Sequence, residues 1–359
     1  IGGIKLMAII DKPSDYFNSV LYTGNAGTQS ITGVGFQPDF FWGKSRSGTK
    51  NNALHDSVRG VTKRLISNST ALELAVATSV TAFGSDGFSL GSDTTSNANG
   101  NTFVTWNWKA GTSVSGNTSG SGTSKAYTGS VSTTTGFSII EYIGNGTAGH
   151  TIPHHLGAVP KMIIMKRINA AGGSAGLDAW QVYHQALGNT KRLVLNSTGA
   201  EDASTTYFND TTPTSSVFTV GTGPAGNNTD YGYVAYSFSE VPNYSKFGTH
   251  TGNGNVNGPF VYTGFKPAFL MIKDASGSGE WLVWDNKRTP SNEMTKALAA
   301  NDSLVEDTTK EMDFLSNGFK IRTTDTNYNA SGNTNIYMAF AENPFVTSTA
   351  NGSIPATAR

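Results

Sequence analysis

The sequence predicts an all-β protein made of three tandem antiparallel β-sandwich domains, jelly-roll-like, with at most one or two short helices each. One pattern of about 100 residues occurs three times, which is too long for a solenoid rung and has the size of a self-contained domain. Short runs rich in aromatic and β-branched residues alternate with Gly, Asn, Asp and Pro, as in strands joined by turns. Long helical periodicity is nearly absent, which favours antiparallel sandwiches over parallel βαβ units.

Four landmarks define the repeated pattern, and they occur in the same order each time. A Gly-Asn pair opens each copy, at Gly24-Asn25, Gly144-Asn145 and Gly252-Asn253. A Gly-x-x-Pro step then leads into an apolar run ending in Lys, with the pairs Pro38 and Lys44, Pro160 and Lys166, and Pro267 and Lys273. An alternating arm follows at Phe88-Ser89-Leu90, Phe218-Thr219-Val220 and Phe319-Lys320-Ile321. Each copy closes with an aromatic run, at Val104 to Trp108, Val234 to Phe238 and Ile336 to Phe340.

The predicted parts along the chain are an N-terminal connector at 1–20, repeat one at 21–110, a linker at 111–135, repeat two at 136–242, repeat three at 243–346, and a tail at 347–359. We expect residues to be missing before Ile1, because the chain does not begin with Met. The linker is almost entirely Gly, Ser, Thr and Asn, a composition typical of flexible or extended connectors. Repeats two and three are joined by a short ordered stretch, so these two are expected to pack together. The tail is small and polar and is expected to be extended.

Two segments permit an amphipathic helix. Lys63 to Thr78 carries Leu65, Leu72, Leu74 and Val76, and Glu293 to Asp307 contains good helix formers. The arm in the first copy follows Asp86-Gly87 and that in the third follows Asn317-Gly318, so both are predicted to be hairpin turns.

Composition excludes several classes of function. The 25 basic and 25 acidic residues cancel and only 14% of the chain is charged, so no electrostatic footprint for nucleic acid or an anionic membrane is present. Without cysteine there are no disulfides, thiolate metal sites or Cys nucleophiles. No apolar stretch reaches the roughly 20 residues that span a bilayer. The 19 Phe, 13 Tyr and 6 Trp favour a packed core over disorder.

No catalytic, cofactor-binding or metal-binding residues are predicted, and no cofactor. Nucleophile-elbow, Walker, dinucleotide and His-Glu-x-x-His motifs are all absent from the sequence. The cluster of His150, His154 and His155 is interpreted as solvated loop histidines rather than a metal site, because too few acidic ligands stand near it. Asp86 and Asp93 resemble a calcium loop, but the hairpin interpretation of Asp-Gly is the stronger one.

Two further sets of residues carry expectations about function. Asp56 and Arg59, with their counterparts Asp285 and Arg288, are interpreted as pairs that pin a turn rather than as acid and base. The six tryptophans are the best candidates for contacting sugars, since flat aromatic faces pack on pyranose rings. They are Trp42, Trp106, Trp108, Trp180, Trp281 and Trp284. Because residues two apart in a strand share a face, at least one of Trp106 and Trp108 is expected in a core.

Several phrases in this chain carry a family resemblance. They are Tyr22-Thr23-Gly24-Asn25, Gly33-Val34-Gly35-Phe36-Gln37-Pro38-Asp39, Asp56-Ser57-Val58-Arg59-Gly60, Phe83-Gly84-Ser85-Asp86-Gly87-Phe88, Tyr262-Thr263-Gly264-Phe265-Lys266-Pro267-Ala268 and Phe340-Ala341-Glu342-Asn343-Pro344-Phe345. Together they resemble the tandem carboxy-terminal modules of tail-fibre-like and other virion proteins of aquatic, marine or cyanobacterial, tailed bacteriophages. The resemblance runs from about Leu21 to Arg359.

The resemblance implies a non-enzymatic virion structural protein, located in a tail fibre, a spike or the capsid surface. We expect it to adhere to host-surface glycans by avidity over repeated modules, and to form a homo-oligomer, with a trimer favoured. Its other expected partners are virion proteins, with no nucleic acid and no membrane insertion. The alternatives are a capsid or tail cementing protein without host contact and, less favoured, a polysaccharide depolymerase.

Overall fold

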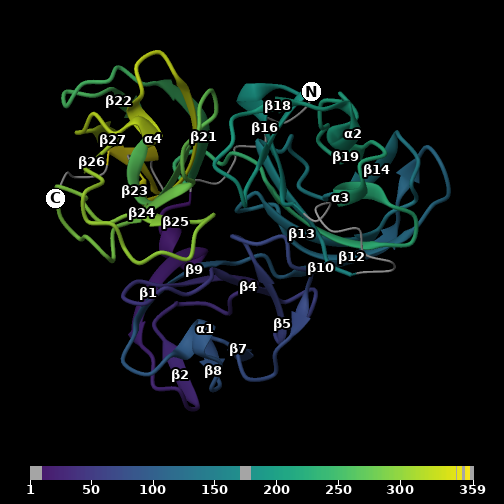
Figure 1. Ribbon diagram of the computed structural model, residues 1–359, viewed down its shortest axis with the longest axis horizontal. Helices are drawn as coiled ribbons and strands as arrows, with labels where there is room; N and C mark the ends of the chain where they lie inside the picture. Colours follow the sequence, from purple (N-terminus) through teal and green to yellow (C-terminus); the bar gives the residue numbers. More distant parts are fainter. Residues whose placement is uncertain (1–9, 170–178, 345, 350–351, 356–359) are drawn as a thin grey trace.

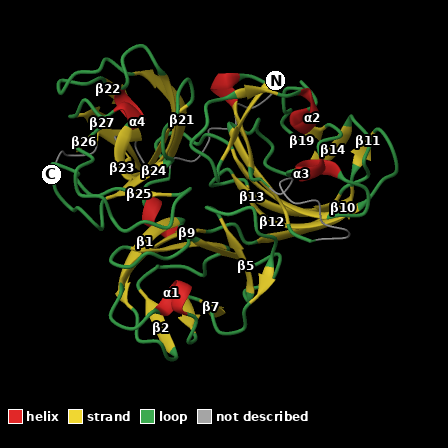
Figure 2. Cartoon of the chain, viewed as in Figure 1, coloured by secondary structure: helices red, strands yellow, loops and turns green. Residues whose placement is uncertain are grey.

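The computed structural model describes residues 10–169, 179–344, 346–349 and 352–355. Figure 2 shows a molecule of strands and loops with a few short helices. All strand pairings among the named elements are antiparallel, which confirms the predicted all-β class. The strands form three similar units, each with one large sheet and one three-stranded sheet.

The first unit spans residues 13–108. Its elements are η1 Pro13–Asp15, β1 Phe17–Thr23, β2 Gln29–Thr32, β3 Phe40–Ser45, β4 Ala53–Asp56, β5 Lys63–Ile66, β6 Leu74–Ala75, β7 Val80–Gly84, β8 Gly87–Leu90, α1 Thr94–Asn97 and β9 Thr102–Trp108. The large sheet has the order β1-β9-β3-β4-β5-β6 and the small sheet the order β2-β8-β7.

The second unit spans residues 112–238. Its elements are β10 Thr112–Asn117, β11 Ser119–Gly120, β12 Ala126–Ser132, β13 Phe137–Ile143, β14 His150–Pro153, β15 Met162–Arg167, β16 Gln181–His184, η2 Gln185–Leu187, β17 Lys191–Val194, β18 Asp202–Ala203, α2 Thr205–Phe208, β19 Val217–Val220, α3 Pro224–Asn227 and β20 Gly232–Phe238. The large sheet is β10-β12-β13-β20-β15-β16-β17-β18 and the small sheet is β11-β14-β19.

The third unit spans residues 245–344. Its elements are β21 Ser245–Thr251, β22 Phe260–Tyr262, β23 Phe265–Asp274, β24 Leu282–Asp285, β25 Leu298–Ala299, β26 Met312–Leu315, β27 Gly318–Ile321, α4 Thr326–Asn329 and β28 Thr334–Pro344. The large sheet is β21-β28-β23-β24-β25 and the small sheet is β22-β27-β26. Two further strands, β29 Val346–Thr349 and β30 Gly352–Pro355, form a hairpin.

A separate apolar core lies between the two sheets of each unit. In the first unit Phe41 of the large sheet packs with Phe88 and Leu90 of the small sheet. The inter-sheet cores of the other two units contain the equivalent arm residues, Phe218 and Phe319. Side chains from both sheets therefore meet in one core, which is the packing of a β-sandwich.

A larger core joins the three units to one another. Figure 1 shows them as three lobes around a common centre, with β9 of the first unit next to the second and third. The closing strands β9, β20 and β28 each lie inside a large sheet; β9 ends in Trp108, β20 ends in Phe238, and β28 carries Phe340 at the equivalent position. The ring centroids of these three residues are 5.6 to 6.4 Å apart in every pairing. The three lobes thus form a closed ring around an aromatic centre, rather than a linear array of domains.

The segment predicted as a linker at 111–135 is instead part of the second unit. β10 pairs with β12, β12 pairs with β13, and β11 pairs with the edge of β14. The linker prediction was wrong because β10 is an edge strand, where backbone pairing needs few apolar side chains, and because β12 buries Tyr127 and Val131 in the inter-sheet core despite its polar composition. The closing strand β9 ends at Trp108 and β10 begins at Thr112, so the first two units are joined by a short connection.

The two predicted helices are also strands or irregular chain. Residues 63–66 and 74–75 are β5 and β6, and within 293–307 only β25 is regular. Leu65 of β5 is buried in the shared core, so tertiary burial outweighs the helical spacing of the leucines. The first unit begins inside the expected connector, because Phe17 packs in the shared core. Of the predicted extended tail, the described residues are paired as β29 and β30, and the rest lies outside the described residues.

The predicted hairpins at Asp86-Gly87 and Asn317-Gly318 are present, as β7–β8 and β26–β27. Their glycines are required by a close backbone approach. A Cβ on Gly87 would lie 2.0 Å from the carbonyl oxygen of Ile31, and one on Gly318 would lie 2.1 Å from that of Val261. The first strand of each small sheet therefore passes directly over these glycines.

Candidate functional site

The six tryptophans are all buried, so the expectation that they contact sugars was wrong. None is more than 1% exposed. Trp106 and Trp108 both lie in the shared core, where alternation placed at least one of them. Trp180 donates from Nε1 to the carbonyl oxygen of Ile66 in the first unit, at 2.9 Å. Trp281 donates in the same way to Val194 in the second unit, at 3.1 Å. The tryptophans therefore fill the cores, and Trp180 and Trp281 also link one unit to the next through hydrogen bonds.

Three buried lysines make a second set of contacts between units. Lys44, Lys166 and Lys273 stand at one register position, opposite Val104, Val234 and Ile336 of the closing strands. Their ammonium groups donate to carbonyl oxygens in the preceding unit of the ring: Lys44 to Ser303 at 2.9 Å, Lys166 to Thr70 at 2.9 Å, and Lys273 to Thr198 at 3.1 Å. The constant Pro-to-Lys distance in the sequence is thus the signature of ring closure.

The Asp–Arg pairs pin turns, as their spacing predicts, and their carboxylates also accept hydrogen bonds from the neighbouring unit. Asp56 accepts from the backbone N–H groups of Val58 and Arg59 and forms an ion pair with the Arg59 guanidinium at 2.5 Å. Tyr236 of the second unit donates its hydroxyl to the same carboxylate, at 2.8 Å. Trp106 of the first unit donates to Asp285 of the third unit in the same way, at 3.0 Å.

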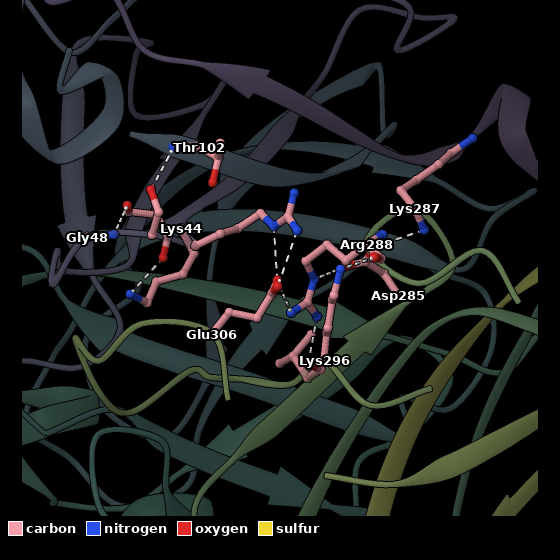
Figure 3. A network of polar contacts seen from close by, with 12 residues as sticks. Lys44, Gly48, Thr102, Asp285, Lys287, Arg288, Lys296 and Glu306 are labelled. Atoms are coloured by element: carbon pink, nitrogen blue, oxygen red, sulfur yellow. Dashed lines mark hydrogen bonds and ion pairs between the residues drawn. The ribbon is translucent and has the colours of Figure 1, made fainter. Parts of the chain in front are cut away.

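Figure 3 shows the network at the joint between the first and third units. Glu306 points towards the guanidinium of Arg288, with an Nη1–Oε2 distance of 3.3 Å, and also accepts two hydrogen bonds from Arg46 of the first unit. Because removing one partner of a buried ion pair leaves the other charge unpaired, this joint depends on both arginines. At the remaining joint, His184 takes the place of the aspartate, with Nε2 3.4 Å from the carbonyl oxygen of Tyr337.

The histidine cluster is not a set of solvated loop residues. His150 and His154 are fully buried, and only His155 is exposed. Nδ1 of His154 accepts from the Leu156 N–H, and its Nε2 donates to the carbonyl oxygen of Thr214. Within the described part of the chain, no group of three His, Cys, Asp or Glu residues is placed to hold a metal ion. Asp86 accepts hydrogen bonds from the backbone of Gly33 and Gly35, which is a loop-capping role.

One surface feature was missed by the sequence reasoning: two large aromatic side chains point outward from β22. Phe260 is 47% exposed and Tyr262 is 58% exposed, while Val261 between them is buried. Residues two apart in a strand lie on one face about 7 Å apart, so the two rings form one platform. The adjoining loop carries exposed Asn253 and Asn257, and Lys320 of β27 stands opposite Phe260 and donates to the carbonyl oxygen of Gly258 at 2.8 Å.

The two other units show that the fold does not need these rings. The small-sheet pairs Ile31–Phe88, Ile152–Phe218 and Val261–Phe319 are equivalent in register. The residues flanking them on the outer face are Ser30 and Thr32 in the first unit and Thr151 and Pro153 in the second. Direct comparison of the three repeats at this register is the signal that could have revealed the platform from sequence.

A cavity of about 570 Å³ lies between the first and second units. The first unit contributes Gln37, Asp39 and Ser57 to its wall, and the second contributes residues of β10 and β12. Asp39 is 5% exposed, and burial raises the pKa of its carboxyl group above the ordinary range. Among the described residues, no helix is long and apolar enough to cross a membrane.

These features define a class of protein: a single-chain ring of three β-sandwich units with a polar joint between each pair and one outward aromatic platform. The chain belongs to the family described as a domain of unknown function (DUF7483), whose model matches residues 12–344. That match covers all three units together. No curated protein and no solved structure matches the chain.

Proposed function

We propose that this chain is a non-enzymatic structural and attachment part of a bacteriophage virion, in a fibre, a spike or a surface decoration. The observation that carries the proposal is the aromatic platform of Phe260 and Tyr262, exposed at positions where the other two repeats have small or polar residues. Exposed aromatic side chains that no core requires are typical of binding surfaces. The asparagine loop beside them is uncharged, and the ammonium group of the neighbouring Lys320 is engaged by the carbonyl oxygen of Gly258. These surroundings suit a neutral, hydroxylated ligand, so we propose host-surface glycan as the occupant.

The closed ring supports an attachment role by making the platform rigid. Each joint combines aromatic packing, a buried lysine and an Asp, His or Glu contact, so the units cannot turn relative to one another without exposing apolar surface. A rigid platform loses little entropy when it binds. Because the platform is present in one unit only, avidity would come from several copies on one particle rather than from the three repeats.

A homotrimer was expected because it would bury exposed aromatic patches, but in this protein the three units of one chain already bury them. Three parallel chains would bury aromatic patches against one another, and here Trp108, Phe238 and Phe340 of one chain do so. We therefore propose that the isolated chain is a monomer. Light scattering on the purified protein should give the mass of one chain, and three times that mass would restore the homotrimer.

The attachment proposal is tested by affinity electrophoresis in gels that contain a neutral galactomannan, a neutral β-glucan or the anionic polymer alginate. The wild-type chain should be retarded by a neutral polysaccharide. The double variant Phe260→Ser with Tyr262→Thr copies the first unit and should lose retardation while keeping its melting temperature. The reverse graft, Ser30→Phe with Thr32→Tyr, should increase it. Unchanged mobility of the wild type in both neutral gels would refute glycan attachment.

Subnanometre imaging of intact virions that contain the chain would separate attachment from the cementing alternative. The attachment proposal places the third unit, with its platform, towards solvent. A chain laid flat with β22 against capsid or tail subunits would favour a cementing role instead.

A further inference from the structure

The cavity between the first and second units departs from the threefold pattern of the ring. Asp39 follows Pro38, and the corresponding positions after Pro160 and Pro267 are Lys161 and Ala268. The equivalence is shown by the backbone, since Ser57 donates its N–H to Asp39, Gln185 to Lys161 and Asn286 to Ala268. Only the first unit therefore places a carboxylate at this corner. Among the described residues, only the second unit has the additional strands β10 and β12, which close the other side.

The Asp39 carboxylate is partly satisfied by its neighbours. Its Oδ1 accepts from the Ser57 hydroxyl at 2.8 Å and from the Ser130 hydroxyl at 3.5 Å, and its Oδ2 accepts from the Ala110 N–H at 2.8 Å. An ionised carboxylate has about four acceptor positions, so at least one is left for a ligand in the cavity. Lys109 acts on the Asp39 carboxylate electrostatically, but among the described residues no Lys, Arg or His is in direct ion-pair contact with it. A half-enclosed carboxylate without a contacting cation favours a ligand that brings a positive charge.

Gly111 keeps the approach to this carboxylate open. Its φ is +107°, a conformation that residues with a side chain rarely adopt. A Cβ at Gly111 would stand 3.9 Å from Asp39 Oδ2, so any longer side chain would extend over the carboxylate from the cavity side. The Gly111 N–H is held by the Ser130 hydroxyl at 2.8 Å, which fixes this edge of the wall.

The rest of the wall indicates the remaining chemistry of the ligand. Ser113, Ser115 and Thr128 contribute hydroxyl groups, and Gln37 contributes an amide. Such groups both donate and accept, which suits a ligand that carries several hydroxyls. Val58 and Val114 supply a small apolar surface for the C–H face of a ring. The volume of about 570 Å³ falls within the range of about 300 to 1,000 Å³ found for small-ligand sites.

We propose that this cavity is a binding site for a hydroxylated ring with a protonated primary amine, that is, an amino sugar. The ammonium group binds Asp39 and the ring hydroxyls bind the serine and threonine side chains of β10 and β12. This site is separate from the β22 platform and does not depend on it. Its contribution is recognition of cationic sugars, whereas the platform binds neutral ones.

The test is a titration of the ¹⁵N-labelled full chain with D-glucosamine, followed through the backbone amide signals of Gly111, Ser113 and Ser130. We expect saturable shifts with a Kd in the millimolar range, about 1 to 10 mM. D-glucose and N-acetyl-D-glucosamine, which lack the charge, should bind at least about ten-fold more weakly. Asp39→Asn keeps an acceptor for the Ala110 N–H and should cause a similar ten-fold loss.

Two further variants keep the test decisive if Asp39→Asn is unstable. Thr128→Phe fills the cavity from an exposed position and should abolish the shifts in a folded protein. Asp15→Asn removes an exposed carboxylate outside the cavity and should leave binding unchanged.

Three outcomes would overturn the proposal. They are no shift with glucosamine up to about 50 mM, equal binding of glucose, and wild-type affinity in Thr128→Phe. Larger shifts of the same amides with calcium chloride than with glucosamine would assign the cavity to a divalent cation instead and would also overturn it.

Discussion

Mild acid should unfold this protein, because its buried histidines are held neutral. Burial lowers the pKa of His55 to about 3 and the pKa values of His154 and His184 to about 4. Each of these rings uses both nitrogens on protein partners. In His55, for example, Nδ1 lies 2.7 Å from the carbonyl oxygen of Val61 and Nε2 lies 3.1 Å from the Ser79 hydroxyl. Protonating the second ring nitrogen would place a positive charge in a buried site without water, where that nitrogen already accepts a hydrogen bond.

The size of the effect follows from proton linkage. A histidine in the unfolded chain has a pKa near 6.5, so at acid pH the unfolded state binds more protons than the folded state. The stabilising contribution is therefore fully present above about pH 6.5 and is lost as the pH falls towards the folded-state pKa. At pH 5 the loss is about 2 kcal/mol for each of the three residues, or about 6 kcal/mol together, against a typical total stability of about 5 to 15 kcal/mol.

Other buried groups modify this sum without changing its sign near pH 5 to 6. Burial also lowers the pKa values of His150 and His250, so both add to the acid instability. Burial raises the pKa values of the Asp39 and Glu141 carboxyl groups, so these favour the folded state as they become protonated. Their opposing contribution develops as the pH falls through their raised folded-state pKa values and is complete near the unfolded-state pKa of about 4, and these two carboxyl groups are outnumbered by the five histidines.

The assay is urea unfolding followed by tryptophan fluorescence at pH values between about 8 and 5. These three histidines should make the free energy of unfolding fall by about 3 kcal/mol per pH unit in the lower half of that range. His184→Gln retains one donor and one acceptor and should reduce this slope by about 1 kcal/mol per unit. His155→Gln, at the exposed neighbour of the buried cluster, is the matched control and should leave the slope unchanged.

A free energy of unfolding that stays constant from pH 8 to pH 5 would refute the reasoning. So would an equal change of slope in His155→Gln and His184→Gln, because burial would then not be the cause.

Three further predictions concern the ring and its turns. Trp108→Ala should lower the free energy of unfolding by about 3 to 5 kcal/mol and should keep a single urea transition, because its ring packs on residues of all three units; separate transitions would show independent units. Burial lowers the pKa values of Lys44 and Lys273 to about 8, so above that pH the unfolded state binds more protons than the folded state, and the free energy of unfolding should rise from pH 8 towards 10. Lys273→Met should weaken this rise, and because it leaves three carbonyl oxygens without their donor it should cost about 1 to 3 kcal/mol or more at pH 7. An unchanged pH profile in this variant would contradict the prediction. Gly318→Ala should lower the melting temperature by several degrees, because its Cβ would meet the Val261 carbonyl oxygen; calorimetry showing no change would exclude the close approach.

The sequence was sufficient to predict the features that depend on neighbouring residues. Alternation and turn dipeptides identified the arms that follow Asp86-Gly87 and Asn317-Gly318, and the i, i+2 rule placed Trp106 or Trp108 in a core. The three copies were visible because each lysine, proline and closing aromatic residue has the same structural task in every unit.

Ring closure could not be predicted, because its contacts join residues far apart in the chain. Lys44 and Ser303 meet across the first and third units, and nothing in the local pattern of either indicates the other. Ring closure also buries five of the six tryptophans in the shared core, and Trp284 is buried in the inter-sheet core of the third unit, so all six were misinterpreted as surface groups. The segment 111–135 was missed for a different reason: an edge strand can be stabilised by backbone hydrogen bonds alone, so its polar composition resembles that of a linker.

The joining of the three units in one chain changes what a single mutation can do. In a ring of three identical subunits, every substitution appears three times, and a residue that suits one joint must suit all of them. Here one joint has His184 where the others have Asp56 and Asp285, and one outer face has Phe260 where the others have Ser30 and Thr151. Each lobe can therefore diverge separately while the other two maintain the fold, so one ring can acquire different surfaces for different partners.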